Sequence, residues 1–276
     1  MKTLDSVLYS GEMSLIVLKM SVAALRYEVR RADAAYRNGQ PLMTDEAFDL
    51  LVEQLRKRAP HAPELQSPFG GTALLSLNKY CFADWHENVG GVARMVVQPK
   101  IDGAAIAIRY VKGKLDAAWT RSGRSAMPII ESLPSVPKTI GSRRESHKGT
   151  VEVHGELYAV DQSRSQQLAA ASLRQKKPNA EGLLFSAYKL MGATGTEVST
   201  MGDLQALGFD VPDTLLCTKA VEVQQLHAKW LRGEVFASWP TDGIVVKVLD
   251  HKLQQKLGAD SVAPNWALAL KKNAEF

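Results

Sequence analysis

The sequence predicts an α+β protein, in which a small helical domain precedes a larger domain rich in strands. Two observations lead to this fold class. Apolar residues recur at steps of three and four between Leu18 and Tyr36, which is typical of an amphipathic helix. From Met95 onward, short apolar and β-branched runs are separated by turn residues, which is typical of strands. A chain of 276 residues is long enough for both domains.

The first domain, residues 1–66, is predicted to be a helical hairpin. Gly39 and Pro41 are stop signals for its first helix. Thr44 is a plausible N-cap for a second helix, whose buried face includes Leu51 and Leu55. The pattern alone favours a helical cap or a dimerisation arm. Proline and glycine then recur over residues 60–75, which indicates a linker before a second domain over residues 67–276.

The second domain is predicted to alternate strands with a few helices. Its first feature is a strand, a tight turn and a strand over residues 96–110, and a hairpin turn follows at 111–114. Further strands are expected at 115–120, 149–160, 183–188, 243–248 and 266–271, and helices at 167–175, 200–207 and 221–231.

Composition narrows the class of protein. A net charge of +5 permits a polyanionic partner such as nucleic acid without proving one. The only two cysteines, Cys81 and Cys217, form no Cys-x-x-Cys pair, which excludes a four-thiolate zinc site and suits a reducing cytoplasm. The most apolar early stretch, residues 13–25, is too short and too polar to span a membrane.

The most informative stretch is Gln98-Pro99-Lys100-Ile101-Asp102-Gly103, which leads from one predicted strand into the next. Gly103 would let the backbone pass close to a ligand or adopt a positive φ. Taken alone, the stretch also fits a surface lysine beside an ordinary turn. Three later motifs accompany it in order, and these are residues 154–158 with Glu156, residues 241–248 with Asp242 and Lys247, and residues 266–271 with Lys271.

In order and spacing, these four motifs resemble the nucleotidyltransferase motifs of covalent nucleic-acid ligases. The chain is most similar to the NAD-dependent DNA ligases of bacteria, and its Gln-Pro-Lys-x-Asp-Gly form resembles their B-type variants. The resemblance implies a covalent nucleotidyltransferase fold, similar to ATP-grasp proteins, with antiparallel sheets and flanking helices. It also implies that a lysine attacks NAD, forms an enzyme–AMP adduct and releases nicotinamide mononucleotide.

The resemblance implies five catalytic residues: Lys100, Asp102, Glu156, Lys247 and Lys271. A lysine can attack only as the neutral amine, which repulsion by two neighbouring lysines would favour. The same two cations would stabilise the phosphoryl oxygens in the transition state. The carboxylates could hold a ribose hydroxyl, an ammonium group or hydrated Mg²⁺, and no single one is assigned to the metal.

The resemblance also implies a set of nucleotide-binding residues. Gln98 stands where a glutamate often reads the adenine amino group, and an amide oxygen can accept the same hydrogen bond. The others are Ser76 and Leu77 beside the adenosine, Gly103, Arg121 and Arg174 toward phosphate, Tyr188 near the adenine and Asp242 as an anchor. For Tyr188, a purely structural tyrosine in the core is an equally good interpretation.

In the first domain, Tyr36, Asp45, Phe48 and Asp49 resemble the nicotinamide-binding residues of the NAD-dependent ligases. Aromatic faces suit the ring, and carboxylates suit its positive charge. Three positions depart from the usual family pattern, with Ala35 for tyrosine, Tyr36 for histidine and Phe48 for tyrosine.

The expected cofactors are NAD and Mg²⁺, and the expected partner is nicked duplex DNA, with no membrane. Family members continue with an OB-fold, a zinc module, helix-hairpin-helix repeats and often a terminal recognition domain, whereas this chain ends five residues after Lys271. The sequence therefore indicates either an excised domain or a naturally short protein, and nick sealing without those modules is in doubt. Two alternatives stay open: an adenylyltransferase that acts on RNA ends or on protein, and a non-catalytic nucleotide-binding module.

Overall fold

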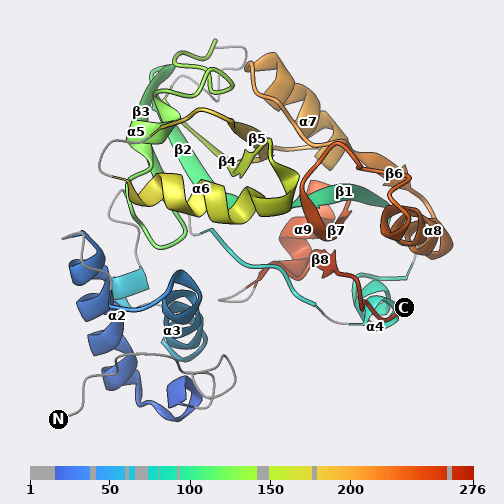
Figure 1. Cartoon of the computed structure of the whole chain (residues 1–276). Helices are drawn as coiled ribbons and strands as arrows, with labels where there is room; N and C mark the ends of the chain where they lie inside the picture. Colours follow the sequence, from blue (N-terminus) through green and yellow to red (C-terminus); the bar gives the residue numbers. More distant parts are fainter. Residues whose placement is uncertain are drawn as a thin grey trace. The chain divides into compact units, whose positions relative to one another are not determined.

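The chain forms two compact units in a computed structural model, Met1–Gly70 and Gly71–Phe276 (Figure 1). The structure describes residues 16–37, 42–59, 62–65, 74–79, 81–91, 94–141, 149–175, 179–259 and 263–276. The division falls four residues after the predicted boundary at residue 66. None of the helices within these ranges is long and apolar enough to cross a bilayer.

Within its described residues, the first unit contains a short helical segment at 16–19, then α2 (Val22–Arg37) and α3 (Asp45–Arg58), and the short 3₁₀ helix η1 (Pro63–Leu65). Its core joins the buried faces of the two helices, with Leu25 on α2 and Leu55 on α3. The predicted N-cap is confirmed, because the Thr44 hydroxyl accepts a hydrogen bond from the Ala47 amide at 3.3 Å.

The predicted first helix is divided in two, with helical residues at 16–19 and α2 from Val22. The helical pattern began at Leu18, but α2 begins at Val22, and Leu18 is 56% exposed. Ser21 interrupts the run because its hydroxyl accepts a hydrogen bond from the Ala24 amide, as a residue at a helix N-terminus does. Val17, rather than Leu18, therefore enters the core.

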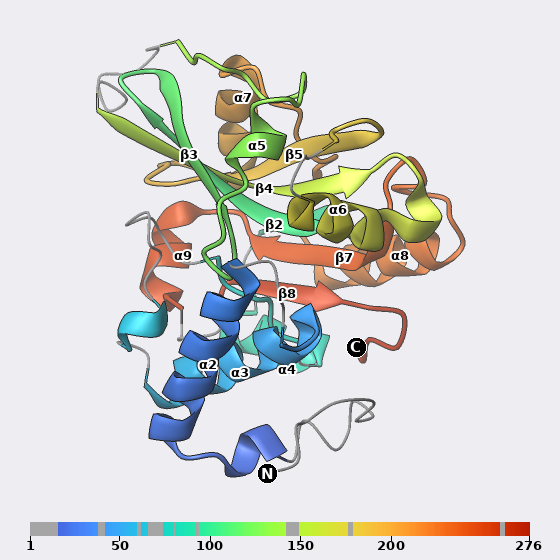
Figure 2. The same cartoon turned by 60° about the vertical axis from the view of Figure 1, so that its left-hand side comes forward.

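The second unit contains two antiparallel four-stranded sheets, which confirms the α+β class (Figure 1). The first sheet has the order β6 (Leu215–Cys217), β1 (Met95–Ile101), β7 (Thr241–Val248) and β8 (Ala267–Leu270). The second sheet has the order β3 (Lys114–Thr120), β2 (Ala104–Val111), β4 (Thr150–Ala159) and β5 (Leu183–Leu190). Figure 2 shows β2, β4 and β5 stacked above β7 and β8.

Helices flank each sheet. The first sheet contacts α4 (Phe82–Asn88), α8 (Ala220–Leu231) and α9 (His251–Leu257), and the second contacts α5 (Met127–Ile130), α6 (Ser165–Arg174) and α7 (Glu197–Ala206). A 3₁₀ turn, η3 (Gln162–Arg164), leads into α6. The sequence did not predict α4, α5, α9 or β6, which are too short to show a clear periodicity.

The strands β1 and β2 are present as predicted, but they do not form a hairpin. They belong to different sheets, so the connection at Asp102 and Gly103 carries the chain from one sheet to the other. The hairpin turn predicted at residues 111–114 is confirmed, and it joins β2 to β3. Its two central residues, Lys112 and Gly113, both have positive φ, as a two-residue hairpin loop of type I′ requires.

The two faces of the first sheet have opposite characters because successive side chains of a strand point to opposite faces. One face is apolar and packs into a core with the helices, through residues such as Val97 and Val246. The other face carries Gln98, Lys100 and Lys247. We call this second face the site face.

Candidate functional site

The centre of the site face is an aspartate held between two lysines. Lys100 Nζ lies 2.7 Å from Asp242 Oδ1, and Lys271 Nζ lies 2.7 Å from Asp242 Oδ2. The register explains the meeting, since Lys100 pairs with Gly243 at one end of the β1–β7 ladder and Lys271 directly follows β8. The structure thus brings together three of the predicted site residues from three adjacent strands.

The two lysines keep Asp242 ionised. Burial alone would raise the pKa of Asp242, but the hydrogen bonds and charges of Lys100 and Lys271 outweigh it and lower that pKa. Asp102 differs, because burial and then the negative charge of Asp242 raise its pKa. Both oxygens of Asp242 are used by ammonium groups, so it acts as an anchor for the two lysines.

Glu156 on β4 belongs to the same electrostatic group. Burial raises the pKa of Glu156 to about 7, although the charges of Lys100 and Arg121 oppose that shift. A carboxyl group with this pKa can exchange a proton near neutral pH.

Gly103 lies against the same strand. A Cβ on Gly103 would lie 2.2 Å from the Leu157 carbonyl oxygen and 3.0 Å from Glu156 Cγ. The φ angle of Gly103 is not positive, so glycine is required there because β4 approaches closely, and not because of the backbone conformation.

Arg121 follows β3 and reaches the segment before α4. Its Nη1 donates to Ser76 Oγ at 3.1 Å, which brings two predicted nucleotide-binding residues into contact. Its Nε is buried and has no hydrogen-bond partner among the described residues. A buried guanidinium donor without a partner is costly, and a bound anion or hydroxyl would satisfy it.

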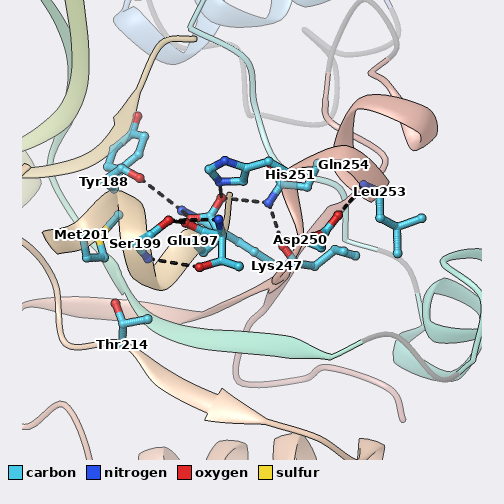
Figure 3. A network of polar contacts seen from close by, with 12 residues as sticks. Tyr188, Glu197, Ser199, Met201, Thr214, Lys247, Asp250, His251, Leu253 and Gln254 are labelled. Atoms are coloured by element: carbon cyan, nitrogen blue, oxygen red, sulfur yellow. Dashed lines mark hydrogen bonds and ion pairs between the residues drawn. The ribbon is translucent and has the colours of Figure 1, made fainter. Parts of the chain in front are cut away.

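Lys247 occupies a separate position on the site face, and Figure 3 shows it beside Glu197. It pairs with Val96, four residues before Lys100, which corresponds to about 13 Å along the strand. Its Nζ lies 3.1 Å from Glu197 Oε2 and 3.3 Å from the Tyr188 carbonyl oxygen. The expectation that Lys247 and Lys271 both lie near Lys100 therefore holds for Lys271, which shares Asp242 with Lys100, whereas Lys247 pairs with the buried carboxylate of Glu197.

Glu197 contacts two further side chains besides Lys247, those of Gln254 and His251. Gln254 donates to Glu197 Oε1 at 2.8 Å, and His251 Nε2 lies 3.5 Å from the same atom. Burial would raise the pKa of Glu197, but the charge of Lys247 and several hydrogen bonds lower it to about 2. Glu197 was not predicted from sequence, because it precedes the helix predicted at 200–207, whereas in the structure it lies in the first turn of α7.

Gln98 is buried, with 2% of its surface exposed. It contacts two side chains that the sequence did not single out, Thr214 and Met201. Its amide Nε2 donates to Thr214 Oγ1 at 2.8 Å, and Met201 Sδ lies 3.5 Å from the same nitrogen.

Ser186 is another residue near Glu156 that the sequence did not predict. It lies opposite Glu156 in the β4–β5 ladder, and its hydroxyl is buried without a partner among the described residues.

The remaining predicted residues lie at the edges of this arrangement or outside the described side chains. The Tyr188 ring lies 5.7 Å from Lys247 Nζ, and burial raises the pKa of its phenol. Arg174 is exposed at the end of α6, and Leu77 lies just before the bridge between Asn78 and β8. Phe48 packs against the core of the first unit, whereas the side chains of Tyr36, Asp45 and Asp49 lie outside the described residues.

The chain is similar to bacterial DNA ligases. It is 29% identical over 313 residues to the DNA ligase of Chloroflexus aurantiacus, covering 90% of this chain and 44% of that protein. It is 30% identical over 298 residues to the DNA ligase of Corynebacterium aurimucosum, with the same two coverages, 90% and 44%. The chain thus spans less than half the length of these relatives.

Among solved structures, the ATP-dependent DNA ligase of bacteriophage T7 in complex with ATP matches with a TM-score of 0.45 and 11% identity. The match covers 72% of this chain and 68% of that one.

A family model that covers most of the chain defines the class of protein, the adenylation domain of a DNA ligase. Within this class, the model of the NAD-dependent DNA ligase adenylation domain matches residues 72–275, and the chain belongs to that family. The family and the fold class expected from sequence are thereby confirmed.

Proposed function

We propose that the second unit transfers the adenylyl group of NAD to Lys100, as the first step of sealing nicks in duplex DNA. One observation carries this proposal most directly. Lys100 and Lys271 share the two oxygens of Asp242, each at 2.7 Å, on the face of the first sheet opposite its apolar core. The family membership supports the reaction class, and the geometry supports the proposed roles of the two lysines.

In the proposed step, the neutral Lys100 amine attacks the α-phosphorus of NAD. A nitrogen–phosphorus bond forms, the bond from phosphorus to the bridging oxygen breaks, and nicotinamide mononucleotide leaves with that oxygen. Lys100 loses its protons to a base on the way. Asp242 is a poor base because its pKa is lowered, so it orients the two lysines. Glu156, with a pKa of about 7, is suited to accept a proton at neutral pH.

The other charged groups suit the rest of the nucleotide. Lys271 would stabilise negative charge that develops on the phosphoryl oxygens beside Lys100. The unpaired Arg121 Nε can donate to a phosphate or ribose oxygen, which would satisfy its buried hydrogen. Gln98, two residues before Lys100 on the same face of β1, would contact the base.

Mg²⁺ would be held by carboxylates and by the substrate. Within the described residues, no group of three histidine, cysteine or acidic side chains is arranged to hold a metal ion. Mg²⁺ commonly uses one or two carboxylates together with substrate phosphates and water. Asp102 and Glu156 fit that mode, because both carboxylate oxygens of Asp242 are already engaged by lysines. The ion would neutralise phosphate charge.

We further propose that the first unit, residues 1–66 in the sequence prediction, binds the nicotinamide half of NAD through Tyr36, Asp45, Phe48 and Asp49. Nicked duplex DNA would be the final substrate, and the cytoplasm would be the compartment. The relatives named as DNA ligases and the positive net charge support the DNA partner.

The test is intact and peptide mass spectrometry of the purified chain before and after incubation with NAD. We expect an increment of one AMP, mapped to Lys100. Lys100→Ala should abolish the increment, while the matched variant Lys256→Ala, at an exposed position on α9, should retain it. A wild-type chain that gains no AMP would leave only the non-catalytic nucleotide-binding alternative.

Two further comparisons separate the remaining possibilities. Equal charging by ATP and NAD would contradict the role proposed for the first unit. Transfer of AMP to the end of an RNA strand or to a protein, with none to the 5′-phosphate of nicked DNA, would favour the stand-alone adenylyltransferase.

A further inference from the structure

We propose that Thr214, together with Met201, fixes the orientation of the Gln98 amide and thereby makes the nucleotide site select a base with an exocyclic amino group. This inference rests on the proposed function and names a determinant of its substrate. Gln98 would contact the base, and Thr214 and Met201 would act through Gln98 as positioning residues.

The fold places these three side chains together from distant segments. Gln98 lies on β1, and Val97 pairs with Leu215, so the next residues along, Gln98 and Thr214, lie opposite each other just beyond β6. Met201 comes from α7, and Figure 3 shows it near Thr214. Gln98 and Met201 are 2% and 5% exposed, so bulk water does not compete for these contacts.

The hydrogen bonds determine which end of the amide faces Thr214. The Thr214 hydroxyl has a single hydrogen, which it donates to the Pro212 carbonyl oxygen at 3.0 Å. Toward Gln98, at 2.8 Å, the same oxygen can therefore only accept. Its neighbour there must be a donor, which is the NH₂ group of the amide.

Met201 gives an independent argument for the same orientation. A thioether sulfur has no hydrogen to donate, and Met201 Sδ lies 3.5 Å from the same atom of Gln98. The carbonyl oxygen in that position would meet two acceptors and lose a hydrogen bond while buried, which costs free energy. The amide is held with its nitrogen toward Thr214 and Met201.

The orientation leaves the Gln98 carbonyl oxygen as the end of the amide that points away from this pair. A carbonyl oxygen accepts a hydrogen bond from the 6-amino group of adenine and repels the 6-keto oxygen of hypoxanthine. An amide turned by 180° would have the opposite preference. The Thr214 hydroxyl therefore discriminates between two bases that it does not touch.

The experiment compares NAD with nicotinamide hypoxanthine dinucleotide, in which a keto oxygen replaces the amino group. For the full chain, the second-order rate constant of covalent charging is measured with each dinucleotide by mass spectrometry. Thr214→Val keeps the shape of the side chain and removes its hydroxyl. We expect it to lower the ratio of the rate constant with NAD to that with the hypoxanthine analogue about tenfold, equivalent to about 1.4 kcal/mol. Thr214→Ser, which keeps the hydroxyl, should retain the wild-type ratio.

The same substitution in a Gln98→Glu variant tests whether Thr214 acts through the orientation of the amide. In Gln98→Glu, both oxygens of the carboxylate are acceptors, so adding Thr214→Val should leave the ratio of that background unchanged. If Thr214→Val slows charging by both dinucleotides equally, Thr214 is merely structural and the inference is overturned while the proposed function stands. If the wild-type chain takes no AMP from NAD, both are overturned.

Discussion

The ion pair between Lys247 and Glu197 gives a quantitative test of the electrostatics on the site face. The perturbation is Glu197→Gln, which keeps the size of the side chain and removes its charge. Lys247 is 7% exposed and Glu197 is 5% exposed, so the substitution leaves a buried ammonium group without its counterion. Gln254 and His251 also lose a charged acceptor.

The magnitude follows from the pKa of Glu197. This pKa falls from 4.5 to about 2 in the folded chain. A shift of about 2.5 pKa units corresponds to about 3 kcal/mol of folding free energy. Removal of one partner from a buried ion pair costs about 3–5 kcal/mol in other proteins, which agrees. We therefore expect Glu197→Gln to lower the free energy of unfolding by about 3 kcal/mol at pH 7.

The sign of the pH dependence is fixed by the direction of this shift. A lowered carboxyl pKa stabilises the folded chain fully at pH values above 4.5, and this stabilisation is lost as the pH falls toward about 2. The difference between wild type and Glu197→Gln should therefore shrink on acidification.

The assay is urea-induced unfolding, followed by circular dichroism, at pH 7 and at several lower pH values. Glu234→Gln is a matched control, since Glu234 forms an exposed ion pair with Arg232 and should change stability little. Equal effects of the two substitutions at pH 7, or a difference that does not vary with pH, would refute the reasoning.

Two further predictions concern the motif around Lys100. Burial raises the pKa of Glu156 to about 7. The contribution of Glu156 to stability is therefore full below pH 4.5 and is lost as the pH rises through about 7. In urea unfolding over that range, wild type should lose more stability than Glu156→Gln. Parallel pH profiles of the two proteins would contradict this. Gly103→Ala should destabilise the chain by about 1–3 kcal/mol, because its Cβ would lie 2.2 Å from the Leu157 carbonyl oxygen. In thermal unfolding, Gly141→Ala, which meets no atom within 4 Å, should have a much smaller effect, and similar losses for both would argue against the packing role.

Local patterns in the sequence were sufficient for most of the elements. The helical period predicted α2 and α3, and the strands β1 to β5, β7 and β8 lie close to their predicted positions. The short elements α4, α5, α9 and β6 were missed because three to seven residues contain too few periods. Ser21 shows a different limit, since one side-chain hydrogen bond divided a run whose apolar spacing looked continuous.

The sequence by itself also indicated the family, because four motifs in a fixed order resemble those of the NAD-dependent DNA ligases. Only the tertiary structure decided which of these groups meet. Lys100 and Asp242 are 142 residues apart, and Lys247 and Glu197 are 50 apart, so each pairing depends on strand register and helix packing. Identical lysines in neighbouring motifs therefore acquire different partners, Asp242 for Lys271 and Glu197 for Lys247. The physical reason is that charge interactions depend on distance in space and on burial, neither of which local spacing in the chain can specify.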